Sequence, residues 1–312
     1  MKNLISVVIA TYNRCESLRD TLNDFVYMKR SDEFDFEIIV ADNNSTDNTK
    51  EIVNNYKASF GEKIQYYFEP VQGKYTALNS GIKQAHGKII ALTDDDCIVS
   101  KDWLFHMWKT FQEIDCDVLG GRVLIKVDSI FPAWLRGNID LLNGPLGFYD
   151  YGNKIKRYNP EIMLPFVGAN TAFKRQCFEE CGLFRTEFGP GKGKKGGDTE
   201  FSRRLQKVGK KMYYAGSVVV THRVQPEMLT LRYISKWYIQ SGRYAAAKKQ
   251  MLNKNFVCYF GVPRYLFREV IQDSISMLPR IFNQRACIES WLKIFFTIGQ
   301  ILGFREAYCA KG

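Results

Sequence analysis

The sequence lacks the patterns that define several common classes of protein. The turn after the first apolar run has no GxGxxG glycine fingerprint, so a dinucleotide site is not expected there. No zinc-finger spacing, basic zipper or RNA-binding signature is present, and we expect no nucleic-acid partner. The N-terminus has no signal-peptide layout, and the eight cysteines form no CxxC pair. Scattered cysteines are typical of reduced thiols, which predicts a cytoplasmic protein.

Long apolar runs are also missing. The longest one near the C-terminus, Trp291 to Phe304, contains Lys293 and Gln300, and we expect it to be too short to span a bilayer. Hydrophobic residues nevertheless make up 46% of the 312 residues, so the chain can bury a sizeable core.

Positive charge is concentrated in the last ninety residues. Residues 1–222 contain 30 Lys and Arg against 28 Asp and Glu, whereas residues 223–312 contain 14 against 5. We therefore expect a first domain over 1–222 and a basic, amphipathic helical region over 223–312. Such helices suit the anionic inner face of a cell membrane, where the protein would be peripheral, but they could equally pack only on the first domain. The basic residues concerned are Arg232, Lys236, Arg243, Lys248, Lys249, Arg264, Arg268, Arg280 and Arg285.

Short apolar runs alternate with helical spacing through the first domain. The runs predict strands, the spacing predicts helices, and the alternation predicts an α/β fold with a mostly parallel sheet and helices on both faces. The expected strands are 4–10, 36–41, 63–68, 88–93, 117–127 and 215–221, and the clearest helices are 17–28, 48–58 and 101–113. Residues 128–165 interrupt this rhythm with prolines, glycines and aromatic residues. We interpret them as a loop on the acceptor side, with ordinary core packing of Trp134 and Tyr149 as the alternative.

Three consecutive carboxylates, Asp94, Asp95 and Asp96, end the fourth apolar run. In open α/β sheets the ligand crevice lies at the carboxyl ends of the strands. Since side chains alternate along an extended chain, Asp94 and Asp96 are expected on one side and Asp95 on the other. Two like charges on one side favour a hard divalent cation between them, although a solvated acidic turn is the alternative.

Other polar residues follow predicted strands or precede predicted helices. Asp42 is expected to accept hydrogen bonds from a nucleoside, and Asp47 to cap the next helix. Asp198 suits either a helix N-cap or a general base, and a lone His222 at a strand end favours a structural role when taken by itself. A glycine-rich loop with Lys192, Lys194 and Lys195 could close over an anion.

Several of these segments, in this order, resemble motifs of the family-two glycosyltransferases, whose nucleotide-sugar-binding fold is called GT-A. The resemblance covers residues 4 to about 222. It is carried by Val7 to Arg14, Val40 to Asp47, Gly73-Lys74 with Ala77 to Ile82, Thr93 to Asp96, Gly168-Ala169-Asn170, and Asp198-Thr199-Glu200 with Arg203. Pro132 to Leu135 and Gly168 to Asn170 further resemble members that build bacterial surface polysaccharides.

The resemblance implies a metal-dependent, inverting transfer of a sugar from a nucleotide sugar, usually a UDP-sugar, to a hydroxyl of a glycan or lipid-linked saccharide. It implies Asp198 as the base, and Mn²⁺ or Mg²⁺ held by Asp96, Asp94 and His222. The residues it assigns to the nucleotide sugar are Thr11, Tyr12, Asn13, Arg14, Asp42, Asn44, Lys74, Asn79, Asp94, Asp95, Gly168, Ala169 and Asn170.

One position departs from the family pattern. An acidic residue normally precedes the catalytic aspartate, but here Gly197 does. Two other functions therefore stay open: a nucleotidyltransferase of the same fold, which would attack phosphorus, and a non-catalytic protein that binds sugar nucleotides or glycans.

Overall fold

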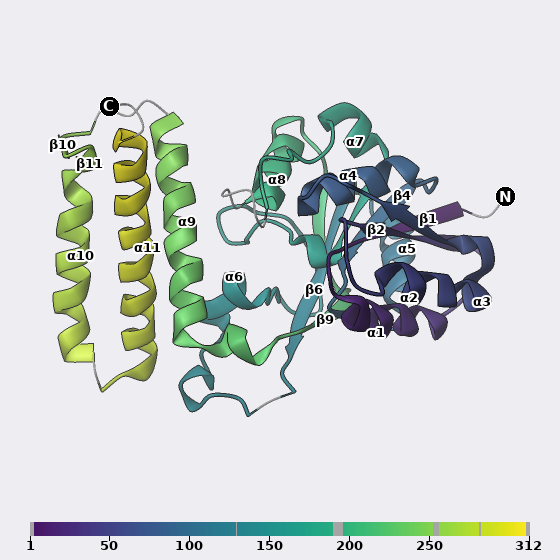
Figure 1. The fold of residues 1–312 in the computed structure, drawn as a ribbon, viewed down its shortest axis with the longest axis horizontal. Coiled ribbons are helices and arrows are strands. Elements are labelled where there is room, and N and C mark those ends of the chain that lie inside the picture. Colours follow the sequence, from purple (N-terminus) through teal and green to yellow (C-terminus); the bar gives the residue numbers. More distant parts are fainter. Residues whose placement is uncertain (1–2, 129, 190–195, 252–255, 281, 310–312) are drawn as a thin grey trace. The chain divides into compact units, whose positions relative to one another are not determined.

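The computed structural model describes residues 3–128, 130–189, 196–251, 256–280 and 282–309 (Figure 1). The chain divides into two compact units. The first unit comprises Met1–Lys126 and Gly147–Arg223, and the second, here called the helical unit, comprises Val127–Leu146 and Val224–Gly312. This division differs from the expected domains 1–222 and 223–312 because residues 127–146 group with the C-terminal part of the chain.

One mixed sheet forms the centre of the first unit. Within the described residues it joins nine strands in the order β3-β2-β1-β4-β8-β6-β9-β5, with β7 paired to β9. β3, β2, β1 and β4 are parallel to one another, β8 is antiparallel to both β4 and β6, and β6 is parallel to β9. The strands are β1 (Asn3–Thr11), β2 (Phe34–Asp42), β3 (Ile64–Phe68), β4 (Ile89–Asp94), β5 (Cys97–Val99), β6 (Val118–Lys126), β7 (Ile155–Arg157), β8 (Thr171–Lys174) and β9 (Met212–Arg223).

Helices cover both faces of this sheet, which confirms the predicted α/β class. On one face, α4 packs so closely that a methyl group added at Gly81 would lie 2.6 Å from Val8. On the other face, Phe25 of α1 packs against Phe36 and Trp103. The helices of this unit are α1 (Cys15–Val26), α2 (Thr49–Asn55), α3 (Lys57–Phe60), α4 (Lys74–Gln84), α5 (Trp103–Glu113), α7 (Gln176–Cys181) and α8 (Gly197–Lys207), with short 3-10 helices η1 (Gly61–Lys63) and η4 (Gly168–Asn170).

The edge strand β5 was not predicted, and it is important for the site. It pairs antiparallel with β9 so that Cys97 lies opposite His222. Its other side is bonded to α1: the Thr21 hydroxyl lies 2.8 Å from the Cys97 carbonyl oxygen, and the Val99 amide donates to Asp24 at 2.9 Å. The turn that carries the three carboxylates is therefore held on both sides.

The irregular stretch 128–165 is divided between the two units. Tyr149 is only 1% exposed and pairs with Val123 in an isolated bridge, so it is a core residue. The earlier part forms three short helices of the helical unit, η2 (Ala133–Leu135), η3 (Ile139–Leu142) and α6 (Asn143–Leu146). An acceptor-side role for this stretch remains a prediction.

Three long helices dominate the helical unit. They are α9 (Leu231–Met251), α10 (Arg264–Met277) and α11 (Gln284–Cys309), with η5 (Pro226–Leu229), η6 (Leu278–Arg280) and the two-stranded hairpin β10 (Cys258–Tyr259) and β11 (Val262–Pro263). Ala246, Val262, Leu266 and Phe304 form a buried cluster.

Several basic side chains of the helical unit are engaged within it. Lys249 donates to Gln300 at 2.7 Å and to Tyr265 at 2.9 Å, so it does not belong to the solvated basic face that the sequence suggested. Arg243 pairs with Glu306 at 2.9 Å, and Arg285 pairs with Asp140 at 2.6 Å. The side chains of Lys248 and Arg280 lie outside the described residues.

Helix α11 is longer than the predicted apolar stretch. It continues through Lys293 and Gln300 for 26 residues, and by length and composition alone it could cross a membrane, which corrects the expectation that this segment is too short. About 39% of its most apolar window is buried within the structure. Gln300 fits an apolar helix because Lys249 satisfies its carbonyl oxygen.

Glycines allow α9 and α11 to meet backbone to backbone. A methyl group added at Gly299 would lie 2.1 Å from the Ile239 carbonyl oxygen, and one at Gly242 would lie 2.0 Å from the Phe296 carbonyl oxygen. At Gly303 the approach is looser: the Ala246 Cβ and the Arg243 Cα would lie 3.0 Å away and the Arg243 carbonyl oxygen 3.1 Å away. The first two positions therefore face a main chain about 1 Å closer than Gly303 does.

We predict that Gly299→Ala lowers the free energy of unfolding by about 1–3 kcal/mol, because overpacking outweighs the better helix propensity of alanine. Gly303→Ala is the matched control, and it should cost less, because its nearest atoms would lie 3.0 Å away instead of 2.1 Å. Urea unfolding of both variants, followed by circular dichroism, makes the comparison. Equal stability of the two variants would contradict the proposed backbone contact.

Candidate active site

A cleft of about 440 Å³ opens at the carboxyl ends of β1, β2 and β4, and its size is typical of small-molecule sites. Parallel strands bring their ends together at one edge of the sheet, where polar residues after the strands can meet. Seven of the predicted site residues line it: Thr11, Tyr12, Arg14, Lys74, Asp94, Asp95 and Asp96. Ala10, Asn43, Gln72 and Gly73 complete the lining.

The three carboxylates do not alternate as predicted. Arg14 Nη1 lies 3.2 Å from Asp95 Oδ1 and 2.7 Å from Asp96 Oδ2, so these two side chains lie close together. Asp94 accepts a hydrogen bond from Lys74 Nζ at 2.6 Å. The alternation fails because β4 ends at Asp94 and the next two residues form a turn.

His222 lies beside Asp96 because of the pairing of β5 with β9. Its Nε2 is 3.4 Å from Asp96 Oδ2. Burial by itself raises the pKa of Asp96, but His222, Arg14 and Lys74 together lower it to about 2. Asp95 is more deeply buried and accepts the Thr11 hydroxyl at 2.7 Å; burial raises its pKa to about 6 against the opposing charge of Arg14.

The expected three-residue metal site is not assembled in this structure. The part of the chain that is described contains no group of three or more His, Cys, Asp and Glu side chains arranged to hold a metal ion. Asp96 and His222 do offer a carboxylate oxygen and an imidazole nitrogen to one point, and this donor pair suits Mn²⁺. Asp94 is directed to Lys74 instead.

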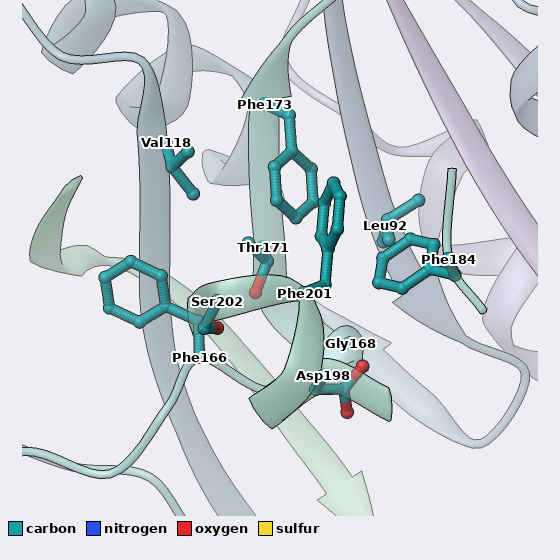
Figure 2. Close-up of a pocket in the computed structure, with 10 residues that line it drawn as sticks. All are labelled: Leu92, Val118, Phe166, Gly168, Thr171, Phe173, Phe184, Asp198, Phe201 and Ser202. Carbon is teal, nitrogen blue, oxygen red and sulfur yellow. The ribbon is translucent and has the colours of Figure 1, made fainter. Parts of the chain in front are cut away.

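Asp198 lies in the first turn of α8, beside Gly168 and at the edge of a group of phenylalanine rings (Figure 2). The N-cap of α8 is Gly196, without a side-chain cap, so Asp198 is not the N-cap that the sequence also allowed. Burial raises the pKa of Asp198, and the positive charge of Lys74 opposes this rise. Lys74 thus interacts with both the acidic turn and Asp198.

Two asparagines that were predicted to contact the nucleotide sugar are bonded within the protein. The Asn79 side chain donates to the Phe184 carbonyl oxygen at 2.8 Å and accepts the Phe184 amide at 3.1 Å. Asn170 accepts from Trp103 Nε1 at 2.8 Å and donates to the carbonyl oxygens of Arg122 and Val218, both at 2.9 Å. Asn170 therefore ties α5, β6 and β9 together. Ala169 follows Gly168 in η4 and is not part of the cleft lining.

The other predicted donor residues lie around the first two loops. Asp42 is 2% exposed and is bonded to Tyr66 at 2.7 Å and to the Ser45 amide at 3.0 Å. Asn13 and Asn44 both have positive φ angles, and Asn13 accepts the Thr46 amide at 2.7 Å, which joins the loops.

The expectation for Asp47 is met in a modified form. It bonds the Thr49 amide at 3.1 Å near the start of α2, whose N-cap is Asn48, and it also bonds the Cys15 amide at 2.9 Å.

The sequence analysis missed the role of Asn43. Its Oδ1 accepts the Gly73 amide at 2.7 Å, and its Nδ2 donates to the Val71 carbonyl oxygen at 2.8 Å. Gln72 in turn donates to the Asn43 carbonyl oxygen at 2.6 Å. These bonds place Lys74 at the cleft; only the position of Asn43 directly after Asp42 could have indicated them. The predicted anion loop with Lys192, Lys194 and Lys195 lies outside the described residues.

Strand order, cleft and acidic turn together define an α/β protein built to hold a polar ligand at the strand ends. Comparison with known proteins specifies the family. The model of glycosyl transferase family 2 matches residues 6–182, and the chain belongs to this family. It is a glycosyltransferase, which sets aside the nucleotidyltransferase and the non-catalytic binding protein that the sequence left open.

Two similar proteins illustrate the relationship. Glycosyltransferase AglE of Haloferax volcanii is 28% identical over 225 residues, which cover 71% of this chain and 67% of AglE. Poly-beta-1,6-N-acetyl-D-glucosamine synthase of Staphylococcus epidermidis is 34% identical over 109 residues. That match covers 35% of this chain and only 26% of the synthase, so the chain spans about a quarter of that relative.

Solved structures share the fold over the whole chain. The mannosyltransferase PcManGT of Pyrobaculum calidifontis, in complex with GDP-Man and Mn²⁺, aligns with a TM-score of 0.55 at 18% identity, over 100% of this chain and 76% of that one. S. aureus TarS in complex with UDP aligns with a TM-score of 0.56 at 16% identity, over 100% and 92%. The predicted GT-A fold is confirmed.

We predict that Asn170→Ala lowers the free energy of unfolding by about 2–4 kcal/mol, because it leaves the buried Trp103 N–H and two carbonyl groups unpaired. Binding of a nucleotide sugar to the folded protein should be unchanged. Thermal unfolding and calorimetric titration measure the two quantities, and Asn54→Ala on the exposed surface of α2 is the control. Normal stability with lost donor binding would restore Asn170 to the donor site.

Proposed function

We propose that the protein transfers a sugar from a nucleotide sugar, most simply a UDP-sugar, to a hydroxyl of a glycan or lipid-linked saccharide, with inversion at the anomeric carbon. One observation carries the proposal. A single lysine, Lys74, is bonded to Asp94 in the cleft and interacts with the partly buried carboxylate of Asp198. A donor-binding region and a candidate base therefore lie next to each other.

The cleft is suited to the diphosphate and nucleoside of a donor. Arg14 and Lys74 supply positive charge, and Tyr12, which is about half exposed, offers a ring to a base. The TarS structures with UDP and UDP-GlcNAc and the PcManGT structure with GDP-Man support the binding of a nucleotide-sugar donor. The synthase relatives support a role in building a polysaccharide.

Asp96 and His222 would hold the Mn²⁺ or Mg²⁺ ion. When bound, such an ion acts as a Lewis acid on the diphosphate charge that develops as the glycosidic bond breaks. In the structure Arg14 neutralises Asp96, so Arg14 would share or release that carboxylate if Asp96 held an ion. Its guanidinium, half exposed in the cleft, is then available to a phosphate oxygen.

Asp198 would act as the general base. A partly buried carboxylate with a raised pKa is a better proton acceptor than a solvated one, and the charge of Lys74 stabilises its ionised form in part. Attack by the deprotonating hydroxyl opposite to the leaving diphosphate is a single displacement, which inverts the anomeric centre.

We predict that Asp198→Asn retains metal-dependent donor binding but loses transfer by about 10²–10⁴-fold, because the base is removed. Asp96→Ala is the contrasting variant, and it should lose Mn²⁺-dependent donor binding because a hard ligand is gone. Calorimetry with donor and Mn²⁺ and release of UDP measure these effects. The anomeric proton coupling of the product reports inversion. Normal transfer by Asp198→Asn, or a retained configuration, would refute the assignment.

The helical unit has an apolar stripe along α10. Phe267, Ile271, Ile275 and Leu278 are all exposed, and their spacing of four, four and three residues puts them on one face of a helix. The opposite side of the helix buries Leu266. Apolar side chains aligned in this way and left uncovered are typical of an interaction surface.

The charges around this stripe favour an anionic partner. Arg264 and Arg268 are exposed and lie on the same side of the helical wheel as the stripe, whereas Glu269 and Asp273 fall on the opposite side. The turn of the hairpin before α10 contains Phe260, which is 86% exposed and has a positive φ angle of 49°. A positive φ angle is unfavourable for a bulky side chain, and burial of the Phe260 ring in the core does not offset this cost.

We therefore propose that the α10 stripe and Phe260 bind the anionic surface of a membrane on the cytoplasmic side. Apolar side chains would enter the headgroup boundary while Arg264 and Arg268 meet lipid phosphates. The eight cysteines, all unpaired, support the cytoplasmic location.

We expect the protein to float with vesicles that contain anionic lipid, and Ile271→Glu to weaken this binding about tenfold or more, through lost apolar burial and charge repulsion. Gln272→Glu introduces the same charge at the neighbouring exposed position, beside the stripe, and should have a smaller effect. No flotation at low salt would refute the proposal. So would a dimer that Ile271→Glu dissociates without any vesicle binding, since the stripe would then join two copies of the chain.

A further inference from the structure

The glycine that replaces the usual acid before Asp198 has a structural cause. A methyl group added at Gly197 would lie 2.3 Å from Cε2 and 2.4 Å from Cζ of Tyr75. The Tyr75 ring therefore occupies the space into which a side chain at this position would project.

The Tyr75 ring cannot easily move away. It is 5% exposed and stacks on Phe184, with ring centroids 5.3 Å apart and planes inclined by 25°. The main chain of Phe184 is itself fixed by both ends of the Asn79 side chain. Gly189 passes the ring on another side, where an added methyl group would lie 3.3 Å away.

The Tyr75 hydroxyl contacts Asp198 in two ways. It accepts a hydrogen bond from the Asp198 amide at 3.1 Å. The hydroxyl also stabilises the ionised Asp198 carboxylate, whose pKa Tyr75 and the Gly168 amide both lower against the rise caused by burial. One phenol thus fixes the main chain at Asp198 and influences the charge of its side chain.

We propose that Tyr75 is the positioning residue of the transfer reaction, holding the Asp198 carboxylate toward the acceptor hydroxyl from the space that the family's acidic neighbour would occupy. This inference rests on the proposed role of Asp198 as the base. The charged groups that face Asp198 are Lys74 and Asp94, and neither is bonded to its amide. Tyr75 therefore fixes the orientation of Asp198, whereas Lys74 is bonded to Asp94 and does not fix it.

Tyr75→Phe tests the inference because it keeps the ring beside Gly197 and removes only the hydroxyl. The ionised Asp198 loses a hydrogen-bond donor, so its pKa rises further. We expect the acidic limb of the kcat/KM profile to move up by about one pH unit and kcat/KM at pH 6 to fall about tenfold or more. Donor affinity should be unchanged. Tyr56→Phe is the control, since its hydroxyl donates to the Arg19 carbonyl oxygen, away from the cleft.

A second measurement does not depend on activity. Burial raises the pKa of Asp198 in the folded protein above its value in the unfolded chain, so ionisation of Asp198 lowers the free energy of unfolding. This loss of stability begins as the pH rises through the unfolded-state pKa, and it is complete above the folded-state pKa. The difference in thermal stability between each protein and its Asp198→Asn counterpart measures the cost. Tyr75→Phe should enlarge it at neutral pH relative to wild type.

The two measurements separate the possible failures. Normal transfer by Asp198→Asn, with an enlarged stability difference in Tyr75→Phe, would reject Asp198 as the base while keeping its contact with Tyr75; the positioning role in transfer would then be overturned. A stability difference and a pH profile that Tyr75→Phe leaves unchanged would overturn the proposed contact itself.

Discussion

The site depends on the compensation of three adjacent negative charges at the end of β4. Like charges this close raise the free energy of the folded state unless cations or strong donors face them. Arg14 bridges Asp95 and Asp96, Lys74 pairs with Asp94, and His222 approaches Asp96. Each of these groups comes from a different part of the chain. The mixed sheet, the α4 start and the β5–β9 pair can be understood as the framework that brings them to one point.

The sequence was sufficient to predict the parallel half of the sheet, because short apolar runs that alternate with helical spacing form β1, β2, β3 and β4. It could not predict β5, β7 and β8, which have three or four residues each and depend on partners far along the chain. Among these short strands, β5 determines the geometry of the site. His222 reaches Asp96 only because β5 pairs with β9, and the alternation expected for the carboxylates fails where β4 gives way to a turn.

The same limit applies to the identity of site residues. Asparagine has both donors and an acceptor, so a sequence motif cannot distinguish an asparagine that holds a ligand from one that joins two segments of the protein. Asn170 and Asn79 are of the second kind in this structure. Lys249 is a similar case: its charge suggested a surface, but Gln300 and Tyr265 receive its donors inside the helical unit. By contrast, the three carboxylates were expected at the cleft from their place after an apolar run, and Arg14 and Lys74 from the family resemblance, and all five line it.

The contacts between α1 and β5 also bear on self-association. An edge strand exposes unpaired amide and carbonyl groups, and these are templates for pairing with another chain. On β5 the outward Cys97 carbonyl oxygen is bonded by the Thr21 hydroxyl, and the Val99 amide is bonded by the Asp24 carboxylate. Side chains of a helix thus occupy the groups that a foreign strand would need. The edge of the sheet nearest the acidic turn is consequently closed to strand addition, and the site is protected from aggregation that would begin there.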